Sequence, residues 1–170
     1  KKYKNAGREK AIFEGLKIVE KKLKENKYLF DKIKLTNCPS ILDYGCSTGY
    51  LKRLLNLTIK KGSYIYKGVD ISEPSISIAK KLYGETNFQR IRSNSDFLKE
   101  NKFDIVYSRD VIHHQKEPYK LIELLLKASK KALILRTPTR DEGKTVLDVN
   151  NSCQLLYEPE IIPFIVFNIE

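Results

Sequence analysis

The chain has 170 residues, of which 41% are hydrophobic and 31% are charged, with a formal net charge of +11. This length suits one domain, and apolar runs along the whole chain argue against bulk disorder. No run reaches the roughly 18 apolar residues of a membrane-spanning helix, and the basic, polar first residues do not resemble a secretory signal. We therefore expect a single-domain cytoplasmic protein over residues 1–170, with no membrane partner.

The 32 basic residues exceed the 21 acidic ones, but they are spread along the chain. This distribution favours a lysine-rich surface over a nucleic-acid tract, although an RNA partner stays possible on charge alone. Cys38, Cys46 and Cys153 lack metal-ligand spacing, so we expect reduced thiols and no metal site. The chain starts at Lys1 and contains no methionine, and we expect that it begins inside a longer gene product or was trimmed.

Residues 8–34 are predicted to form one long helix, the main element of an N-terminal helical segment (residues 1–37). Apolar side chains from Ile12 to Leu23 recur at helical spacing with lysines and glutamates between them.

Short β-type runs then alternate with amphipathic helices over residues 38–136. Strands are expected at Ile41–Tyr44, Tyr64–Val69, Phe88–Arg92, Phe103–Tyr107 and Ala132–Leu135. Helices are expected at about residues 49–58, 73–83 and 117–130, while residues 93–101 leave room for a turn or a very short helix. This alternation predicts an α/β fold, a three-layer αβα sandwich around a mostly parallel, doubly wound sheet.

Residues 137–170 are predicted to form a C-terminal loop and hairpin. The part up to Asn150 is polar and loop-like. The apolar runs Cys153–Tyr157 and Ile161–Ile169 are joined by too short a connection for a parallel crossover, so we expect an antiparallel hairpin. Pro163 then belongs near the start of its strand or at a sheet edge.

The segment from Asp43 to Gly49 carries the most specific signal. A buried strand ends in an acidic residue, turns through Gly45 and Gly49, and enters a helix. Glycines permit sharp turns and close approach of a ligand to the backbone, and free amides at a helix N-terminus bind anionic groups. Asp70 ends the next strand, where an acid in a nucleotide-binding unit accepts hydrogen bonds from ribose hydroxyls.

Two other enzyme classes fit this segment less well. Ser47 stands where a dinucleotide-binding motif has its middle glycine, which disfavours a nicotinamide-dependent dehydrogenase. Residues 45–49 also match the Gly-x-Ser-x-Gly elbow of α/β-hydrolases, but they follow the first strand and no oxyanion-hole segment is visible.

The motifs and their order resemble those of class I S-adenosylmethionine-dependent methyltransferases of the small-molecule type, over about residues 38–136. The segments that carry the resemblance are Asp43-x-Gly45-x-Ser47-x-Gly49, Asp70, Ser95-Asp96-Phe97, Phe103-Asp104-Ile105-Val106 and Val111-Ile112-His113-His114. The helix that usually precedes the last two strands of that family is not visible in this chain.

The resemblance implies S-adenosylmethionine as cofactor, S-adenosylhomocysteine as product, and methyl transfer to a small-molecule acceptor. The cofactor-binding residues that it implies are Asp43, Gly45, Cys46, Ser47, Gly49, Asp70, Ile71, Ser95, Asp96, Phe97, Ser108 and Arg109. His113 and His114 are the candidate catalytic residues, because a histidine can act as general base on an acceptor hydroxyl. An RNA-directed methyltransferase and a non-catalytic cofactor-binding scaffold remain alternatives, and the oligomeric state stays open.

Overall fold

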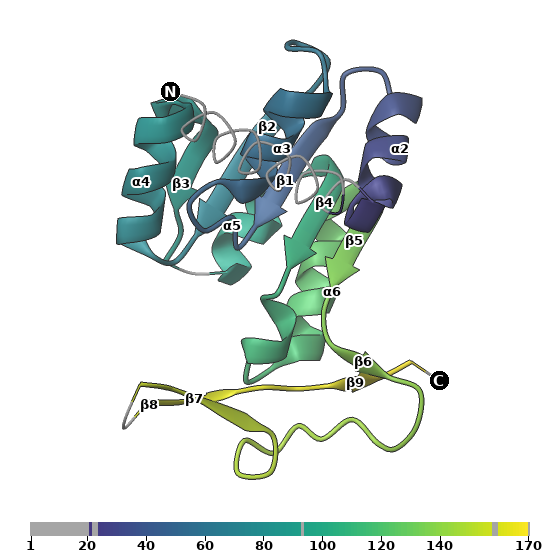
Figure 1. The fold of residues 1–170 in the computed structure, drawn as a ribbon, viewed down its shortest axis with the longest axis vertical. Coiled ribbons are helices and arrows are strands. Elements are labelled where there is room, and N and C mark those ends of the chain that lie inside the picture. The colour runs from purple at the N-terminus through teal and green to yellow at the C-terminus, as the bar shows by residue number, and fades with distance from the viewer. Residues whose placement is uncertain (1–20, 22–23, 93, 158–159, 170) are drawn as a thin grey trace, which may run out of the picture. The chain divides into compact units, whose positions relative to one another are not determined.

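The computed structural model describes residues 21, 24–92, 94–157 and 160–169 (Figure 1). The chain divides into two compact units, Lys1–Thr36 and Asn37–Glu170. No helix among the described residues is long and apolar enough to cross a membrane.

The first unit contains helix α2 (Lys27–Leu35). The prediction of one continuous helix is wrong at Asn26, whose φ of −110° and ψ of 15° are not helical. Asparagine is a poor helix former because its side chain competes for backbone hydrogen bonds. The part of the prediction before Lys21 lies outside the described residues.

The second unit is built on a parallel sheet of five strands in the order β3-β2-β1-β4-β5. The strands are β1 (Ser40–Tyr44), β2 (Ile65–Asp70), β3 (Phe88–Arg90), β4 (Phe103–Arg109) and β5 (Ser129–Arg136). The chain moves outward from β1 to β3 and then returns to β4 on the other side of β1. The predicted doubly wound α/β fold is confirmed, with its topological switch point between β1 and β4.

Helices connect these strands and form the outer layers (Figure 1). They are α3 (Tyr50–Thr58), α4 (Glu73–Tyr83), α5 (Asn94–Glu100) and α6 (Pro118–Ala128), with short 3-10 turns η1 (Glu85–Asn87) and η2 (Ile112–His114). Because parallel crossovers are right-handed, α3 and α4 cover one face, whereas α5 and α6 pack together on the other. Between the layers lie fully buried strand residues such as Leu42, Val69 and Val106.

The C-terminal residues stand apart from the main sheet, beyond the carboxyl ends of β4 and β5 in Figure 1. Strands β7 (Cys153–Tyr157) and β8 (Glu160–Pro163) pair antiparallel as a sheet of their own. Strand β9 (Phe167–Asn168) pairs parallel with β6 (Thr139–Arg140). The second apolar run is therefore not one strand, as predicted, but two strands separated by residues 164–166.

This break has a packing reason. Ile165 is fully buried and, with Phe167, joins the core cluster that includes Leu121 and Leu125 of α6. Pro163 is the last residue of β8 and not near its start, but a two-stranded sheet has only edge strands, where proline is tolerated.

Candidate active site

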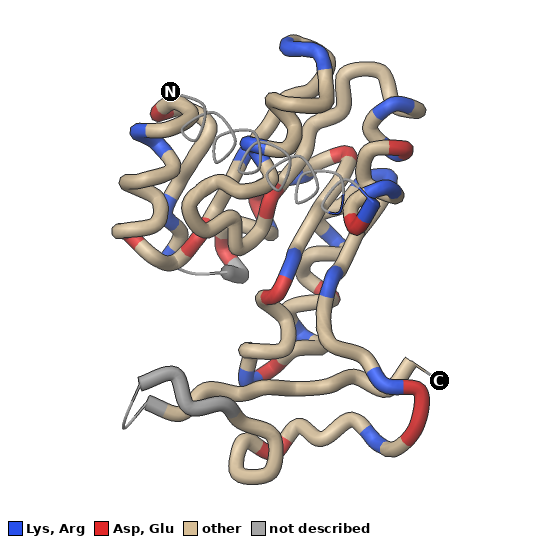
Figure 2. Tube along the Cα trace, in the orientation of Figure 1, with Lys and Arg blue, Asp and Glu red and all other residues tan. Residues whose placement is uncertain are grey.

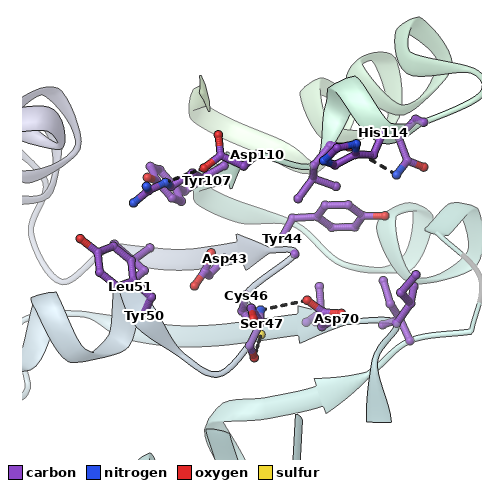
Figure 3. A pocket seen from close by; sticks show the side chains of 17 residues that line it. Asp43, Tyr44, Cys46, Ser47, Tyr50, Leu51, Asp70, Tyr107, Asp110 and His114 are labelled. Atoms are coloured by element: carbon purple, nitrogen blue, oxygen red, sulfur yellow. Dashed lines mark hydrogen bonds and ion pairs between the residues drawn. The ribbon is translucent and has the colours of Figure 1, made fainter. Parts of the chain in front are cut away.

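A cavity of about 530 Å³ lies at the carboxyl ends of β1, β2 and β4 (Figure 3). Its lining comes from these strand ends, the loops after them, the residue that follows β3 and the start of α3. It includes Asp43, Gly45, Cys46, Ser47, Tyr50, Asp70, Ile71, Ile91, Arg109, Asp110, Val111, His114 and Gln115. The cavity thus occupies the switch point, where open α/β sheets bind their ligands.

The turn from β1 to α3 needs glycine at both ends. Gly45 has a φ of +78°, and a Cβ there would lie 2.2 Å from Cγ2 of Val111. Gly49 has a φ of +87° and precedes the first helical residue of α3. The amides of Gly45 and Cys46 both donate to the carbonyl oxygen of Val69, at 2.9 and 3.0 Å. The loop is therefore anchored to β2 at its start.

The carboxylate of Asp70 connects this loop to the start of α4. Its Oδ2 accepts a hydrogen bond from the amide of Ser47 at 2.9 Å (Figure 3), and its Oδ1 accepts one from the amide of Ser72 at the same distance. Each carboxylate oxygen has a further lone pair, so Asp70 can accept additional hydrogen bonds from a ligand. Ser47 has a φ of 48°, a conformation for which glycine is better suited.

Asp43 is only 4% exposed, although it borders the cavity. Burial raises the pKa of its carboxyl to about 7, against the effect of a 2.7 Å hydrogen bond from the Tyr66 hydroxyl. The side chain of Tyr66 passes over Gly68. A Cβ at position 68 would lie 2.9 Å from the hydroxyl oxygen of Tyr66. We did not predict either of these β2 residues, Tyr66 and Gly68, from the sequence. Their two-residue spacing, which places them on one face of a strand, was the available signal.

Cys46 and Ile71 both line the cavity, but they differ in how much of their surface is exposed to solvent. Cys46 is buried, which raises the pKa of its thiol. Ile71, in contrast, exposes 66% of its surface at the end of β2. An apolar side chain at this position can pack against a flat ligand ring.

The end of β4 brings a charged pair to the cavity. Arg109 donates from Nε to Oδ2 of Asp110 at 2.9 Å, and its guanidinium lies 5.1 Å from the ring centre of Tyr50. Asp110 has a φ of 56°, which turns the chain sharply after the strand. Ser108 does not line the cavity. It is fully buried, and its hydroxyl donates to the carbonyl oxygen of Tyr44 at 3.1 Å, which links β4 to β1.

Asp96 and Phe97 are not among the described residues that line the cavity, and the side chain of Ser95 lies outside the described part of the structure. Asp96 lies in the first turn of α5. Phe97 stacks on Phe103, with ring centres 6.4 Å apart. Phe103 is the first residue of β4, so Phe97 points toward the amino end of the sheet. Ile91, which directly follows β3, borders the cavity, whereas Phe97 does not.

The two histidines differ in position. His114 lines the cavity, and its Nδ1 is 2.9 Å from the carbonyl oxygen of Pro163. His113 lies outside the lining and is 4% exposed, and its Nδ1 has no hydrogen-bond partner among the described residues. Burial lowers the pKa of His113, and the adjacent His114 lowers it further. Only His114 is placed to meet a ligand.

Known proteins share the sequence motifs and the fold that surround this cavity. A family model described as a methyltransferase domain matches residues 42–132, which include β1 to β4 and the first part of β5. No match was found among the curated protein sequences.

Several solved structures share the fold. Magnesium protoporphyrin IX methyltransferase from Synechocystis, with S-adenosylhomocysteine bound, is 25% identical over 72% of this chain and 55% of its own, with a TM-score of 0.52. Its S-adenosylmethionine complex matches at 23% identity over 72% and 58%, with a TM-score of 0.52. The [4+2]-cyclase SpnF matches at 20% identity over 70% and 47%, with a TM-score of 0.53.

The chain spans about half the length of the solved structures that it matches. The family model covers more than half of the chain, and it includes the motif-bearing strands that surround the cavity. The chain therefore belongs to the methyltransferase-domain family, among the class I S-adenosylmethionine-dependent enzymes.

Proposed function

We propose that this chain binds S-adenosylmethionine in the cavity and transfers its methyl group to a small-molecule acceptor. The observation that carries the proposal is the position of Asp70, a carboxylate on the cavity wall that also holds the amide of Ser47 in the glycine-rich turn. Such a pairing of an acid at the end of β2 with the turn after β1 suits the ribose of a nucleoside.

The residues present fit this cofactor. The cavity volume of about 530 Å³ is within the usual range for small-molecule sites. Asp43 and Asp70 place two carboxylates around a ligand that carries a sulfonium and an ammonium group. When bound, the cofactor supplies an electrophilic methyl group, and the protein supplies position and orientation.

We assign the ribose hydroxyls to Asp70 and the adenine to Ile71 and Ile91. The methionine part is assigned to Asp43 and the turn that begins at Gly45. Asp96, Phe97 and Ser108 are left out of this assignment, since the described cavity lining does not include them.

Two observations bear on the alternatives. A [4+2]-cyclase has the same fold, so the fold by itself does not determine the reaction. The basic residues of the described chain are scattered over many elements and do not gather along one (Figure 2), which favours a small molecule over RNA as acceptor. An RNA acceptor would give binding that weakens steeply with salt.

Titration calorimetry with S-adenosylhomocysteine tests the cofactor assignment. Asp70→Ala should weaken binding by about 1–3 kcal/mol, roughly 5- to 150-fold, the loss expected for hydrogen bonds to a charged group. Glu73→Ala is the matched control, because it removes a nearby carboxylate that does not line the cavity. Equal affinities of the wild type and Asp70→Ala would contradict the assignment.

A further inference from the structure

A short C-terminal segment, Pro163–Ile165, holds the turn that contains both histidines. The amide of Ile165 donates to the carbonyl oxygen of His113 at 2.9 Å. Nδ1 of His114 is 2.9 Å from the carbonyl oxygen of Pro163. Because Ile165 is fully buried in the core, the segment that makes these contacts is itself firmly placed.

Phe164 adds ring contacts on the same turn. Its ring centre lies 5.1 Å from that of His113 in an edge-to-face arrangement and 5.9 Å from that of His114. The two imidazole centres are 3.9 Å apart. The backbone of Phe164 is fixed on both sides by Ser152, whose carbonyl oxygen accepts at 3.0 Å and whose hydroxyl donates at 2.7 Å. The orientation of the His114 ring is thus set by packing as well as by a hydrogen bond.

The hydrogen bond to Pro163 determines where the proton of His114 lies. A carbonyl oxygen can only accept, so Nδ1 must carry the hydrogen. In a neutral imidazole the other nitrogen, Nε2, then has a free lone pair. No hydrogen bond to this Nε2 is found within the part of the chain that the structure describes. His114 lines the cavity together with Asp110 and Arg109, so its ring borders the site of the proposed cofactor.

We propose that Pro163–Ile165 is a positioning element that presents Nε2 of His114 as the proton acceptor of the methyl-acceptor site. The segment lies outside residues 42–132, which the family model matches. The proposal rests on the proposed function and deepens it, because a base is needed only when the acceptor has a proton to lose. The acceptor class is therefore a neutral protic group such as a hydroxyl, and not a carboxylate. Its oxygen forms the bond to the methyl carbon as the bond from that carbon to the sulfonium sulfur breaks, its proton moves to Nε2, and S-adenosylhomocysteine is the leaving group.

Nitrogen NMR of the whole chain tests the positioning directly. His113 and His114 are the only histidines, so protein labelled with ¹⁵N-histidine gives two imidazole patterns, which His113→Asn assigns. In alkaline buffer, where imidazoles are neutral, we expect His114 to carry its proton on Nδ1 and to leave Nε2 unprotonated. Protonation of His114 on Nε2, the form that free histidine favours in water, would overturn the proposal.

A matched pair of variants separates positioning from general packing. Phe164→Leu removes the ring that contacts both histidines and should give a mixture of His114 tautomers. Phe167→Leu changes a ring of the neighbouring strand β9, which packs on Tyr119 with centres 6.1 Å apart, and should keep the wild-type pattern. An equal change in both variants, or in neither, would contradict the positioning role of Phe164.

Calorimetry with S-adenosylhomocysteine on the same samples keeps the two proposals distinguishable. The NMR pattern of His114 does not require the cofactor. If S-adenosylhomocysteine does not bind and His114 is protonated on Nδ1, the proposed function is contradicted but the positioning of His114 is supported. If S-adenosylhomocysteine binds and His114 is protonated on Nε2, the positioning is contradicted but the proposed cofactor site is supported.

Discussion

Two carboxylates at opposite ends of the sheet show how differently its ends are built. At the amino end of β4, Asp104 accepts from the amide and the hydroxyl of Ser40 at 2.9 and 2.8 Å, and Lys131 lies 3.3 Å away. The Ser40 amide and then its hydroxyl lower the pKa of Asp104 to about 2. At the carboxyl end of β1, Asp43 has one hydrogen-bond donor among the described residues, Tyr66, and burial raises the pKa of its carboxyl to about 7.

The two carboxylates have different roles: Asp104 stabilises the fold, whereas Asp43 is available to a ligand. Ser40 and Asp104 satisfy each other and thereby join the starts of β1 and β4. Asp43 is left with unused acceptor capacity beside a cavity, at an energetic cost that a cationic ligand would offset. We infer that the amino end of the sheet serves stability and the carboxyl end serves binding.

The largest expected effect comes from the glycine turn at the carboxyl end. Gly45→Ala places a Cβ 2.2 Å from Cγ2 of Val111 and leaves alanine at a φ of +78°, so the free energy of unfolding should fall by about 2–4 kcal/mol. Gly62→Ala is the control, because Gly62 has a φ of +86° but open space around it, and should cost about 1–2 kcal/mol. Urea denaturation measures both, and equal losses would show that the contact with Val111 is unimportant.

A smaller loss of stability, without loss of binding, is expected at the amino end. Ser40→Ala removes the hydroxyl that donates to Asp104 and accepts from its amide, which should lower the free energy of unfolding by about 1–2 kcal/mol. The affinity for S-adenosylhomocysteine should not change. A folded Ser40→Ala protein with weakened binding would break the proposed division between the two ends.

The two ends should also respond oppositely to pH. Folded Asp43 keeps a proton between its ordinary pKa of 3.8 and about 7, so its contribution to stability is lost as pH rises through this window, by at most about 1.4 kcal/mol per pH unit. Folded Asp104 is ionised down to about pH 2, so its contribution is present above pH 3.8 and lost as pH falls from 3.8 to 2. Unfolding curves of Asp43→Asn and Asp104→Asn across pH should each lack one of these slopes, and a variant that kept its slope would refute the assignment.

The smallest effect concerns the donor to Asp43. Tyr66→Phe removes the hydrogen bond that favours the carboxylate, so the pKa of Asp43 should rise further. If Asp43 binds the ligand's ammonium group, binding of S-adenosylhomocysteine strengthens as pH rises through about 7 in the wild type. The variant should show the same rise about half to one pH unit higher. Tyr64→Phe, which removes a hydroxyl bonded to Asn56, should leave the profile unchanged, and an identical shift in both variants would contradict the role of Tyr66.

Local patterns predicted the parts of the fold that depend on local chemistry. The alternating strands and helices were placed to within a few residues because apolar periodicity and turn residues act over short distances. The positions of Asp43 and Asp70 at strand ends followed in the same way. The interruption at Asn26 was not visible because the lysines and glutamates around it continue a helical pattern.

Contacts between distant residues could not be predicted. Whether Phe97 faces the cavity or the core depends on how α5 packs under β4, which no neighbouring residue specifies. The contacts of Phe164 with His113 and His114 join residues about fifty positions apart. The hydrogen bond from Tyr66 to Asp43 depends on the register between β1 and β2, in which Asp43 pairs with Gly68.

Mapping the backbone amides that shift when S-adenosylhomocysteine is added shows where the ligand binds. We expect the largest NMR shifts at the carboxyl ends of β1 and β2, at Gly45, Ser47 and Ser72. The amides of Ser40 and Asp104 at the amino end should stay unchanged. Shifts concentrated at the amino end, or no shifts at saturating ligand, would contradict the claim that the cavity at the switch point is the cofactor site.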